Sequence, residues 1–271
     1  MNGVRFTVNQ RCRRFVRKIR RAILRDEPTY YDMFENRGER YFARLYLHQI
    51  NQTIHNEGFS APLKILDAGC QTGRLAIPLS QAGHHVTGVD TSGLALRRLK
   101  RHANECGTSL RLIRANLTRW LPKQSDHCFD VVVCTEVLYL RENYRQILTG
   151  LIRLLRPGGL LFISHRPTGY YLAEAFQLKD LEAARLVATK REGILWGSYY
   201  NWQDRQGLDH LYRDLQISPI AMTPIGLLSW LAVNPEELNQ SEQDLLFEAE
   251  TAAAQRYRES GRYLLVCGRK T

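Results

Sequence analysis

The stretch KILDAGCQTGRLAIPLSQAGHHVTGVDTS, residues 64–92, constrains the fold more than any other part of the chain. An apolar run at 64–68 leads into a glycine-containing turn, a helical pattern follows over 74–82, and a second apolar run occupies 85–89. Short apolar runs that alternate with helical patterns are typical of parallel strands joined by crossover helices. The stretch therefore predicts the opening βαβ unit of an α/β domain.

The same alternation continues to residue 165 and then changes. Further strands are predicted at 110–114, 129–134 and 160–165, and further helices at 94–106 and 143–155. Beyond residue 165, helical stretches are predicted at 170–189 and 203–215, on either side of the aromatic segment LWGSYYNW. The remaining elements are strands near 217–222 and 262–267, with helices near 226–231 and 241–257. These patterns predict one α/β domain with a helical, aromatic lid after the fifth strand.

The turn after the first predicted strand indicates which kind of ligand the domain holds. Dinucleotide sites use the pattern G-x-G-x-x-G, in which the middle glycine makes room for a pyrophosphate. Here Gly69 and Gly73 are spaced G-x-x-x-G, and Gln71 stands in the middle position. Asp90 ends the second strand, where a carboxylate can accept both hydroxyls of a ribose. The pattern favours adenosine without phosphates, although both glycines could serve a tight turn and Asp90 could cap the next helix.

Five motifs in order make the chain resemble the class I S-adenosylmethionine-dependent methyltransferases. They are ILDAGCQTG, VTGVDTS, IRANLTRWLP, FDVVVCTEVLYL and LRPGGLLFIS. The resemblance covers about residues 60–220 and extends to the last predicted strand, RYLLVCGRK. It implies a Rossmann-like seven-stranded sheet in the order 3-2-1-4-5-7-6 with the last strand antiparallel, preceded by N-terminal helices.

The resemblance also implies the residues of a cofactor site for S-adenosylmethionine. These are Asp67, Gly69, Cys70, Gly73, Asp90, Thr91, Asn116, Leu117 and Thr135. Asp67 would orient the amino group of the methionine portion, Asp90 would hold the ribose, and Asn116 with Leu117 would frame the adenine. Two residues depart from the family pattern: Gln71 replaces a common glycine, and Asn116 replaces an aspartate that usually receives the adenine amino group.

Proton removal from an acceptor needs a base near the transferred methyl group, and the sequence offers His165 and Glu136. Both residues are expected at the carboxyl ends of neighbouring strands, so they could converge on one crevice. His165 is the first choice because its ordinary pKa suits neutral pH. In the alternative interpretation, His165 only hydrogen-bonds the lid, Glu136 only meets a backbone amide or Tyr139, and placement of the acceptor supplies catalysis.

The fourth motif narrows the class of acceptor. It lacks the [D/N]-P-P-[Y/F] pattern of enzymes that methylate exocyclic amines in nucleic acids, the Pro-Cys pair of RNA cytosine enzymes and the paired glutamates of arginine methyltransferases. A small organic or lipid-soluble acceptor is therefore favoured. Lid aromatics could face it, or they could form a core of the lid itself. They are Tyr170, Tyr171, Phe176, Trp196, Tyr199, Tyr200 and Trp202.

The positive charge is concentrated at the N-terminus. Residues 1–25 contain nine basic side chains and no acid, so the formal charge of +11 leaves only +2 for residues 26–271. Apolar residues recur in this leader at helical spacing, which predicts a basic amphipathic helix. It could bind anionic lipid or RNA, act as an import sequence, or simply pack on the domain. We divide the chain into a basic helical segment, 1–58, and a methyltransferase domain, 59–271, with a lid insertion at about 166–215.

Two alternatives to small-molecule methylation stay open at this point. One is an RNA methyltransferase that uses the arginine-rich leader to grip phosphates, and the other is a non-catalytic scaffold that keeps the cofactor fold. Six scattered cysteines form no C-x-x-C pair or Cys/His cluster, so we expect no metal site and reduced thiols in the cytoplasm. No apolar run approaches the roughly 18 residues of a membrane span. We expect a cytoplasmic protein that could also attach peripherally to a membrane surface.

Overall fold

The computed structural model of the chain describes residues 32–258 and 260–271. The predicted basic helix of the leader lies outside these residues. Among the residues that are described, no helix has the length and apolar character needed to cross a bilayer.

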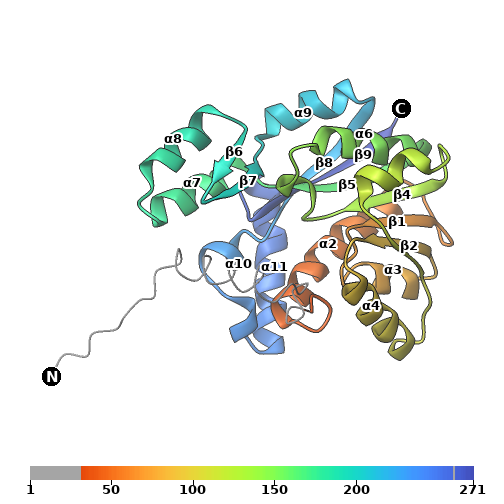
Figure 1. The fold of residues 1–271 in the computed structure, drawn as a ribbon. Coiled ribbons are helices and arrows are strands. Elements are labelled where there is room, and N and C mark those ends of the chain that lie inside the picture. The colour runs from red at the N-terminus through yellow and green to blue at the C-terminus, as the bar shows by residue number, and fades with distance from the viewer. Residues whose placement is uncertain (1–31, 259) are drawn as a thin grey trace.

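Seven strands form one mixed sheet in the order β3-β2-β1-β4-β5-β9-β8 (Figure 1). Neighbours from β3 to β5 are parallel, whereas β9 is antiparallel to both β5 and β8. Because β6 and β7 form a separate hairpin, this order is the predicted 3-2-1-4-5-7-6 arrangement, which is confirmed. The strands are β1 (Lys64–Ala68), β2 (His85–Asp90), β3 (Arg111–Arg114), β4 (Phe129–Cys134), β5 (Leu155–His165), β8 (Ile217–Ile225) and β9 (Tyr263–Lys270).

Helices cover both faces of the sheet. Figure 1 shows α6 and α9 on one face and α2, α3, α4 and α11 on the other. The α-helices are α2 (Arg37–Asn56), α3 (Ala76–Gln81), α4 (Gly93–Glu105), α5 (Leu117–Trp120), α6 (Tyr144–Leu154), α7 (Thr168–Gln177), α8 (Leu181–Thr189), α9 (Arg205–Asp214), α10 (Leu228–Leu231) and α11 (Gln240–Arg256). Short 3-10 turns are η1 (Leu121–Lys123), η2 (Leu138–Leu140) and η3 (Pro235–Glu237).

Alternating residues of the central strands fill two separate cores. Val131 and Val133 of β4 face the α2 side of the sheet, whereas Val132 and Cys134 face the α6 side. All four side chains are fully buried. Strands covered on both faces need apolar residues at every position, because successive side chains point to opposite faces. This requirement explains the continuous apolar runs from which the sheet was predicted.

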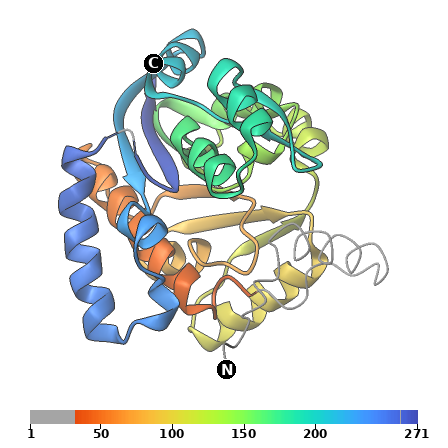
Figure 2. The ribbon, with the colours of Figure 1, turned by 90° about the vertical axis from the view of Figure 1, so that its left-hand side faces the viewer.

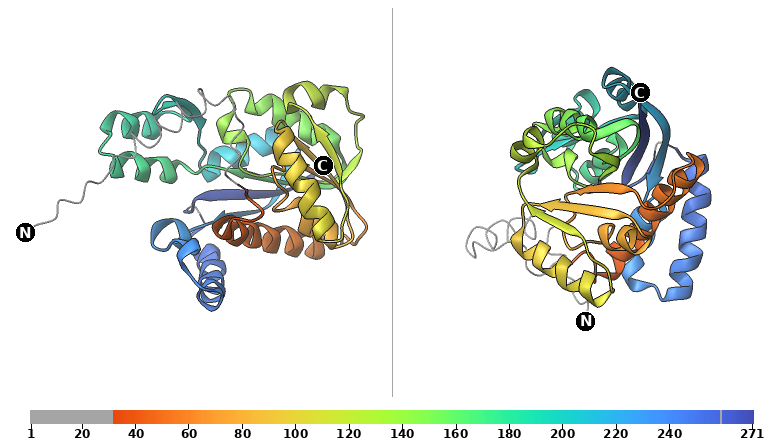
Figure 3. Two further views of the ribbon diagram at one scale, coloured as in Figure 1. Left: turned by 60° about the horizontal axis from the view of Figure 1, so that its bottom comes forward. Right: turned by 90° about the vertical axis from the view of Figure 1, so that its right-hand side faces the viewer.

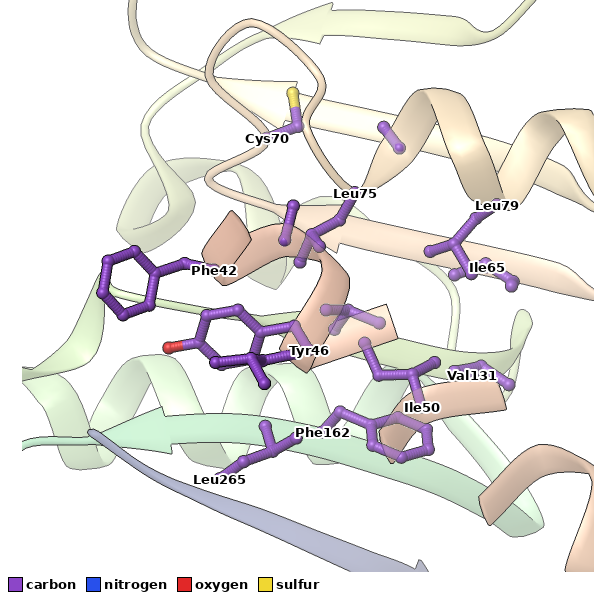
Figure 4. Packing of buried hydrophobic residues seen from close by; sticks show 14 of the residues in the cluster. Phe42, Tyr46, Ile50, Ile65, Cys70, Leu75, Leu79, Val131, Phe162 and Leu265 are labelled. Atoms are coloured by element: carbon purple, nitrogen blue, oxygen red, sulfur yellow. The ribbon is translucent and has the colours of Figure 1, made fainter. Parts of the chain in front are cut away.

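Helix α2 belongs to the same core as the sheet. It begins after Asn36, whose side chain accepts a hydrogen bond from the backbone N–H of Glu39, as helix N-caps do. Tyr46 and Ile50 are fully buried and lie with Phe42 among residues from β1, β4 and β5 (Figure 4). Seen from the side in Figure 2, α11 runs along the outer side of α2. Residues 37–56 therefore share the core of the domain that follows them.

The lid projects beyond the end of the sheet, away from α3 and α4 (Figure 3). The single helix expected over 170–189 is two helices, α7 and α8, which separate at Lys179 with φ 54°. Asp180 caps α8 by accepting from the N–H of Ala183. The aromatic segment LWGSYYNW, left without a predicted structure, lies in the hairpin of β6 (Glu192–Leu195) and β7 (Ser198–Asn201). Its two-residue turn has positive φ at Trp196 and Gly197, which suits a tight hairpin.

Several of the lid aromatics form a small core of the lid. Tyr171 and Trp202 are buried together with residues of α7, α8 and β6, and Tyr170, Trp196 and Tyr200 pack against this cluster. Phe176 is 60% exposed. The alternative in which the aromatics stabilise the lid itself therefore holds for these five residues.

Candidate cofactor site

A cavity of about 360 Å³ opens where β1, β2 and β4 end. The carboxyl ends of parallel strands are where α/β sheets bind ligands. Eight of the nine predicted cofactor residues line this cavity: Asp67, Gly69, Cys70, Asp90, Thr91, Asn116, Leu117 and Thr135. Glu136 lines it as well, whereas Gly73 and His165 do not.

The loop after β1 needs unusual backbone angles to wrap the cavity. Gly69 has φ 91°, and a Cβ atom built there would lie 2.3 Å from Cγ2 of Val137. Gln71, at the position where the resemblance implies a glycine, also has positive φ, 45°. Its backbone N–H donates to Oδ2 of Asp90 at 3.0 Å, which holds the loop against β2. The loop thus keeps a conformation that glycine adopts readily, although a longer side chain stands there.

Gly73 contributes to packing and does not line the cavity, so its contact with the cofactor stays a prediction. A Cβ atom built at Gly73 would lie 2.8 Å from Cγ of Leu99 in α4, and its φ is 93°. The residue lets the turn into α3 approach α4 closely. Its place in the motif reflects this close approach, one turn behind the cavity wall.

Asp90 organises the cavity wall through both of its carboxylate oxygens. Oδ1 accepts from the N–H of Ser92 at 2.8 Å, and Oδ2 accepts from Gln71. The N-cap of α4 is Ser92, which accepts from the N–H of Ala95, so the alternative of Asp90 as the helix cap is wrong. A carboxylate oxygen can accept more than one hydrogen bond, so acceptor capacity is left for a ligand hydroxyl. Thr91 follows Asp90 on the same wall.

Asp67 is a buried carboxylate that forms no ion pair with any described residue. Its side chain is 3% exposed. Burial is the main cause that raises the pKa of Asp67 to about 7; the positive charge of Arg74 and a hydrogen bond from the backbone of Ala76 oppose this rise, and the charge of Asp90 adds to it. A cationic ligand group at this position would favour the ionised form.

Asn116 and Leu117 form the far wall of the cavity. Oδ1 of Asn116 accepts from the N–H of Thr118 at 2.9 Å and so caps α5. That oxygen keeps a second lone pair, so it can still accept from an exocyclic amine. Leu117 is buried beneath it and supplies an apolar surface.

Glu136 lies in a buried charge network that the sequence did not predict. It follows β4 with φ 62° and lines the cavity, and its N–H donates to Oγ of Ser164 at 2.6 Å. Arg74 donates to its Oε1 and Tyr263 to its Oε2, each at 2.5 Å. Burial alone would raise the pKa of Glu136, but Arg74, Arg262 and these hydrogen bonds hold it below its usual range. An ionised carboxylate with both oxygens engaged is a weak base.

The structure does not bring His165 to the cavity, which corrects its assignment as the first-choice base. The side chain is fully buried on the α9 side of β5, where Nε2 lies 2.7 Å from the hydroxyl of Tyr212. Burial lowers the pKa of His165 to about 3. Glu136 follows β4 and faces the cavity. Because successive side chains of a strand point to opposite faces of the sheet, His165 at the end of β5 points to the face that α9 covers.

Arg74 is the most informative residue that sequence reasoning missed. It is 5% exposed, lines the cavity, and pairs with Glu39 of α2 as well as with Glu136. Its signal in the sequence was only a basic residue directly after Gly73. The partners lie 35 and 62 positions away. No local pattern connects them.

Met33 also lines the cavity, because the segment before α2 is held on both sides. The N–H of Phe34 donates to Oγ1 of Thr72 at 3.0 Å, and Nε2 of His102 lies 2.9 Å from Oδ2 of Asp32. Asp32, Glu35 and His102 converge in a manner that could hold a metal ion. Arg98 lies 3.8 Å from Asp32, and Arg101 lies 3.1 Å from Glu35. Arginines therefore already match this negative charge.

The donor set of the cavity fits a cationic adenosine derivative. Asp90 offers a carboxylate to vicinal hydroxyls, Asn116 offers a side-chain carbonyl beside the apolar Leu117, and Asp67 offers a buried carboxylate without an ion-pair partner. Such a buried charge is costly unless it is paired. S-adenosylmethionine has a ribose, an adenine and two cationic groups, so the residues present match its chemistry.

Comparisons with known proteins agree with this geometry. Residues 65–159 match the family model described as methyltransferase domain. A ubiquinone biosynthesis O-methyltransferase of Rickettsia felis is 33% identical over 102 residues, which are 38% of this chain and 41% of that protein. The chain thus matches less than half the length of this relative.

Two solved structures have a similar fold. Magnesium protoporphyrin IX methyltransferase of Synechocystis PCC 6803, with bound SAH, gives a TM-score of 0.58 at 15% identity and covers 95% of this chain and 94% of that one. 1,6-Didemethyltoxoflavin-N1-methyltransferase of Burkholderia thailandensis gives 0.54 at 17% identity and covers 96% and 86%. The methyltransferase-domain match at residues 65–159, the strand order and the cavity agree with the fold of the class I S-adenosylmethionine-dependent methyltransferases that the sequence motifs resemble.

Proposed function

We propose that this protein transfers a methyl group from S-adenosylmethionine to an oxygen, nitrogen or carbon atom of a small organic or lipid-soluble acceptor. The observation that carries the proposal is the convergence of eight predicted cofactor residues on one cavity. They come from four separate motifs, between residues 67 and 135. Chance convergence of so many matched residues is implausible for a scaffold that binds nothing.

Residues of the cavity walls would hold the cofactor. Asp90 accepts the ribose hydroxyls, Asn116 and Leu117 hold the adenine, and Asp67 faces the ammonium group. When bound, S-adenosylmethionine supplies a methyl group that is attached to a sulfonium. When the methyl group is transferred, the sulfur departs as a neutral thioether. The protein then has to place the acceptor in line with that methyl group and exclude water.

Glu136 and Thr135 line the cavity after β4, and we assign them to the methyl-transfer end because Glu136 is connected through Tyr263 to Arg166, which stacks on Tyr170 of the lid. Because Arg74 and Tyr263 occupy both carboxylate oxygens of Glu136, we propose that Glu136 orients neighbouring groups and stabilises positive charge, without removing a proton. Placement of the acceptor would then be the main source of catalysis, as the alternative interpretation of the sequence held.

A small acceptor is supported by the named activities of relatives and by the lid. The Rickettsia felis relative is named for ubiquinone biosynthesis, and the Burkholderia neighbour was solved with 1,6-didemethyltoxoflavin. Tyr170, which packs against the core of the lid, also stacks on Arg166 directly after β5, so at least one aromatic ring of the lid lies at the end of that strand. The described residues give no comparable support for RNA as acceptor.

Binding of the cofactor tests the first part of the proposal. Calorimetry should detect binding of S-adenosylmethionine and its demethylated product but not of NAD, because the turn lacks the pyrophosphate glycine. Asp90→Ala should weaken binding by about 1.5 to 3 kcal/mol, the worth of a hydrogen bond to a charged group. Asp130→Ala is the matched control, because Asp130 lies at the amino end of the sheet and bonds Lys64 and Arg156. Equal affinity of the Asp90 variant and the wild type would contradict the assignment.

Methyl transfer tests the second part. Purified protein and labelled S-adenosylmethionine are incubated with cell extract, which is then divided into RNA, protein and organic-solvent fractions. Label in the organic fraction is expected. Label in RNA would establish the RNA alternative, and cofactor binding without any transfer would favour the scaffold.

We further propose a cytoplasmic location with peripheral attachment through the basic leader. Nine basic side chains and no acid within residues 1–25 support an electrostatic partner, either an anionic lipid surface or RNA. Lipid is the favoured partner because a lipid-soluble acceptor would be found there.

A further inference from the structure

Arg166 is a buried cation at the junction of the sheet and the lid. It directly follows β5 and is 6% exposed. Its guanidinium carbon lies 3.9 Å from the ring centres of Tyr170 and Tyr263 and 4.8 Å from that of Tyr139. Three aromatic faces thus surround one positive charge, an arrangement that attracts cations because the face of each ring is electron-rich.

The charge of Arg166 is not matched by a carboxylate. Among the residues that the structure describes, it forms no ion pair: Nη1 donates to the backbone carbonyl of Arg262 at 2.8 Å, and Nη2 donates to the hydroxyl of Tyr263 at 2.9 Å. Its Nε has no hydrogen-bond partner. Glu136, on the far side of the Tyr263 hydroxyl, is already paired with Arg74. An unpaired buried charge is costly to the fold.

A second buried donor without a partner belongs to the residue after Tyr170, whose ring lies against Arg166. The hydroxyl of Tyr171 is buried and forms no hydrogen bond, and the positive charge of Arg166 acts on this group. The Tyr171 ring packs edge-on against Tyr170 at 5.2 Å, and Tyr170 lies in turn against Trp230 at 5.0 Å. Buried donors without a partner are uncommon in a folded interior. Among the described residues, five buried side-chain atoms lack a hydrogen-bond partner, and of these only Nε of Arg166 carries a positive charge, which favours an anion.

The position of Arg166 connects this place to the cofactor cavity. Arg166 donates to Tyr263, Tyr263 donates to Glu136, and Glu136 lines the cavity. The methyl-transfer end is therefore two hydrogen bonds away from the guanidinium. A planar molecule with its anionic group at Arg166 would extend toward that end along aromatic walls.

We infer that Arg166 and Tyr171 bind a carboxylate of the acceptor, and that the acceptor is a small aromatic acid flanked by Tyr139 and Tyr170. This inference rests on the proposed function and narrows its acceptor class. Nε of Arg166 and the hydroxyl of Tyr171 each offer one donor, which matches the two oxygens of a carboxylate. Because Arg166 is so deeply buried, the inference requires that the lid opens to admit the acceptor.

A structural role for the charge explains less. If Arg166 only joined β5 to β9 and α7, it would need its hydrogen bonds to Arg262 and Tyr263. A neutral donor could form both of these hydrogen bonds. It needs neither the unpaired Nε nor the unpaired Tyr171 hydroxyl. Binding of an anion accounts for all of these features at once.

Calorimetric titration with matched probes tests the inference. The full chain, both alone and saturated with S-adenosylhomocysteine, is titrated with 4-hydroxybenzoate and 3,4-dihydroxybenzoate and with the neutral methyl esters of both. The wild type is expected to bind the acids at least tenfold more tightly than their esters. Arg166→Met should abolish this preference, and Tyr171→Phe should lower it about tenfold, the effect of one hydrogen bond to a charged group. Arg185→Met, an exposed arginine of the same lid, is the control and should keep the preference.

The outcomes separate this inference from the proposed function. If S-adenosylhomocysteine binds but acids and esters bind equally, or no acid binds, the inference is overturned and the proposed function stands. If S-adenosylhomocysteine does not bind, the proposed function fails, and titration of the protein alone still decides whether Arg166 selects acids. Should Arg166→Met fail to fold, Tyr171→Phe and Arg166→Lys decide: unchanged preference for acids in both variants would overturn the inference.

Discussion

Asp67 and Asp90 lie at the carboxyl ends of the neighbouring strands β1 and β2, and both line the cavity. Two arginines, Arg74 and Arg141, line the same cavity. Asp90 is satisfied by backbone amides, whereas Asp67 is buried without an ion-pair partner among the described residues. Their environments therefore separate two chemically identical groups. We therefore expect the protonation of Asp67 to respond to a bound cation, whereas Asp90 holds the loop after β1 through the backbone N–H of Gln71.

Cofactor affinity should depend on pH through Asp67. Its pKa is raised to about 7, so below that pH the carboxyl group is mostly protonated in the free protein. A cationic ligand requires the ionised form, so affinity should rise between about pH 6 and about pH 8, by up to about tenfold per pH unit below the pKa. In the free protein the sign is opposite: stability falls as the pH rises toward 7, because ionisation costs more in the fold than in the unfolded chain.

Calorimetry across this range, with Asp67→Asn as the comparison, measures the effect. The amide cannot ionise, so the variant should bind more weakly and with a flat pH profile. The same slope in the variant and the wild type would assign the pH dependence to another group and remove Asp67 from the ammonium site.

Gly69→Ala should destabilise the protein beyond the ordinary cost of positive φ. The new Cβ would lie 2.3 Å from Val137, in addition to the strain of φ 91°. Gly158→Ala is the control, since Gly158 has φ 75° and no atom within 4 Å of the added Cβ. We expect losses in the free energy of unfolding of about 1 kcal/mol for the control and about 2 to 4 kcal/mol for Gly69→Ala. Denaturant titration measures both, and equal losses would show that Val137 yields without cost.

At the scale of elements, Arg74 joins three parts of the fold that meet at the cavity. Its guanidinium pairs with Glu39 of α2 and Glu136 after β4, and Arg74 itself stands just before α3. All three side chains are nearly excluded from water, with exposed fractions of 5%, 7% and 12%. The cavity floor therefore depends on the presence of α2, a helix outside the matched domain.

Arg74→Met should cost about 3 to 5 kcal/mol of unfolding free energy, because it leaves two buried carboxylates without their cation. Arg44→Met removes a half-exposed arginine that pairs with Asp244 on the surface and stacks on Phe247, and its loss should be much smaller, because a surface ion pair contributes little. Neutralising the partners in the triple variant with Glu39→Gln and Glu136→Gln should recover part of the loss. Thermal or denaturant unfolding checks the series. A loss of similar size in both single variants would mean that the network is not a buried charge cluster in solution.

Sequence patterns predicted the sheet better than the lid, for a physical reason. Each central strand is buried on both faces, so its own residues must be apolar, and β1 and β4 have the predicted bounds, 64–68 and 129–134. The lid hairpin instead depends on a turn at Trp196 and on contacts with α7 and α8. Those contacts join residues that are distant in the sequence, so a local sequence pattern cannot predict them.

Over the whole molecule, the cofactor cavity and the place inferred for the acceptor differ in how far apart their residues lie in the sequence. The cofactor cavity is lined mostly by consecutive motifs within residues 65–159, the part that matches the methyltransferase domain. The place inferred for the acceptor combines Tyr139, Arg166 and Tyr263, and the last two are 97 positions apart. Sequence reasoning therefore selected residues that line the cavity, whose role with a cofactor stays a prediction, and it selected His165, which lies on the opposite face of β5 from the cavity.

The leader determines the charge of the whole molecule and should determine where it associates. Removing residues 1–25 deletes nine basic side chains and lowers the formal charge from +11 to +2 while leaving every described residue in place. Calorimetry should therefore find S-adenosylhomocysteine affinity within about twofold of the full chain, since no residue of the cavity is lost. Sedimentation with vesicles of anionic lipid should show binding by the full chain at low salt, and the truncated chain should remain in the supernatant.

Salt and lipid charge give the controls for this last prediction. The attraction between basic side chains and anionic lipid decays over a Debye length, which is about 8 Å at physiological ionic strength and shortens as salt is added. Added salt should therefore release the full chain from anionic vesicles. Vesicles of neutral lipid should bind little of it. A fluorescent RNA oligonucleotide is titrated in parallel. If the full chain bound RNA with a steep salt dependence but did not bind vesicles, the partner of the leader would be RNA, as in the alternative of an RNA methyltransferase. If the full chain bound neither partner at low salt, the leader would have no electrostatic partner of either class, and its apolar stripe would instead pack on the domain.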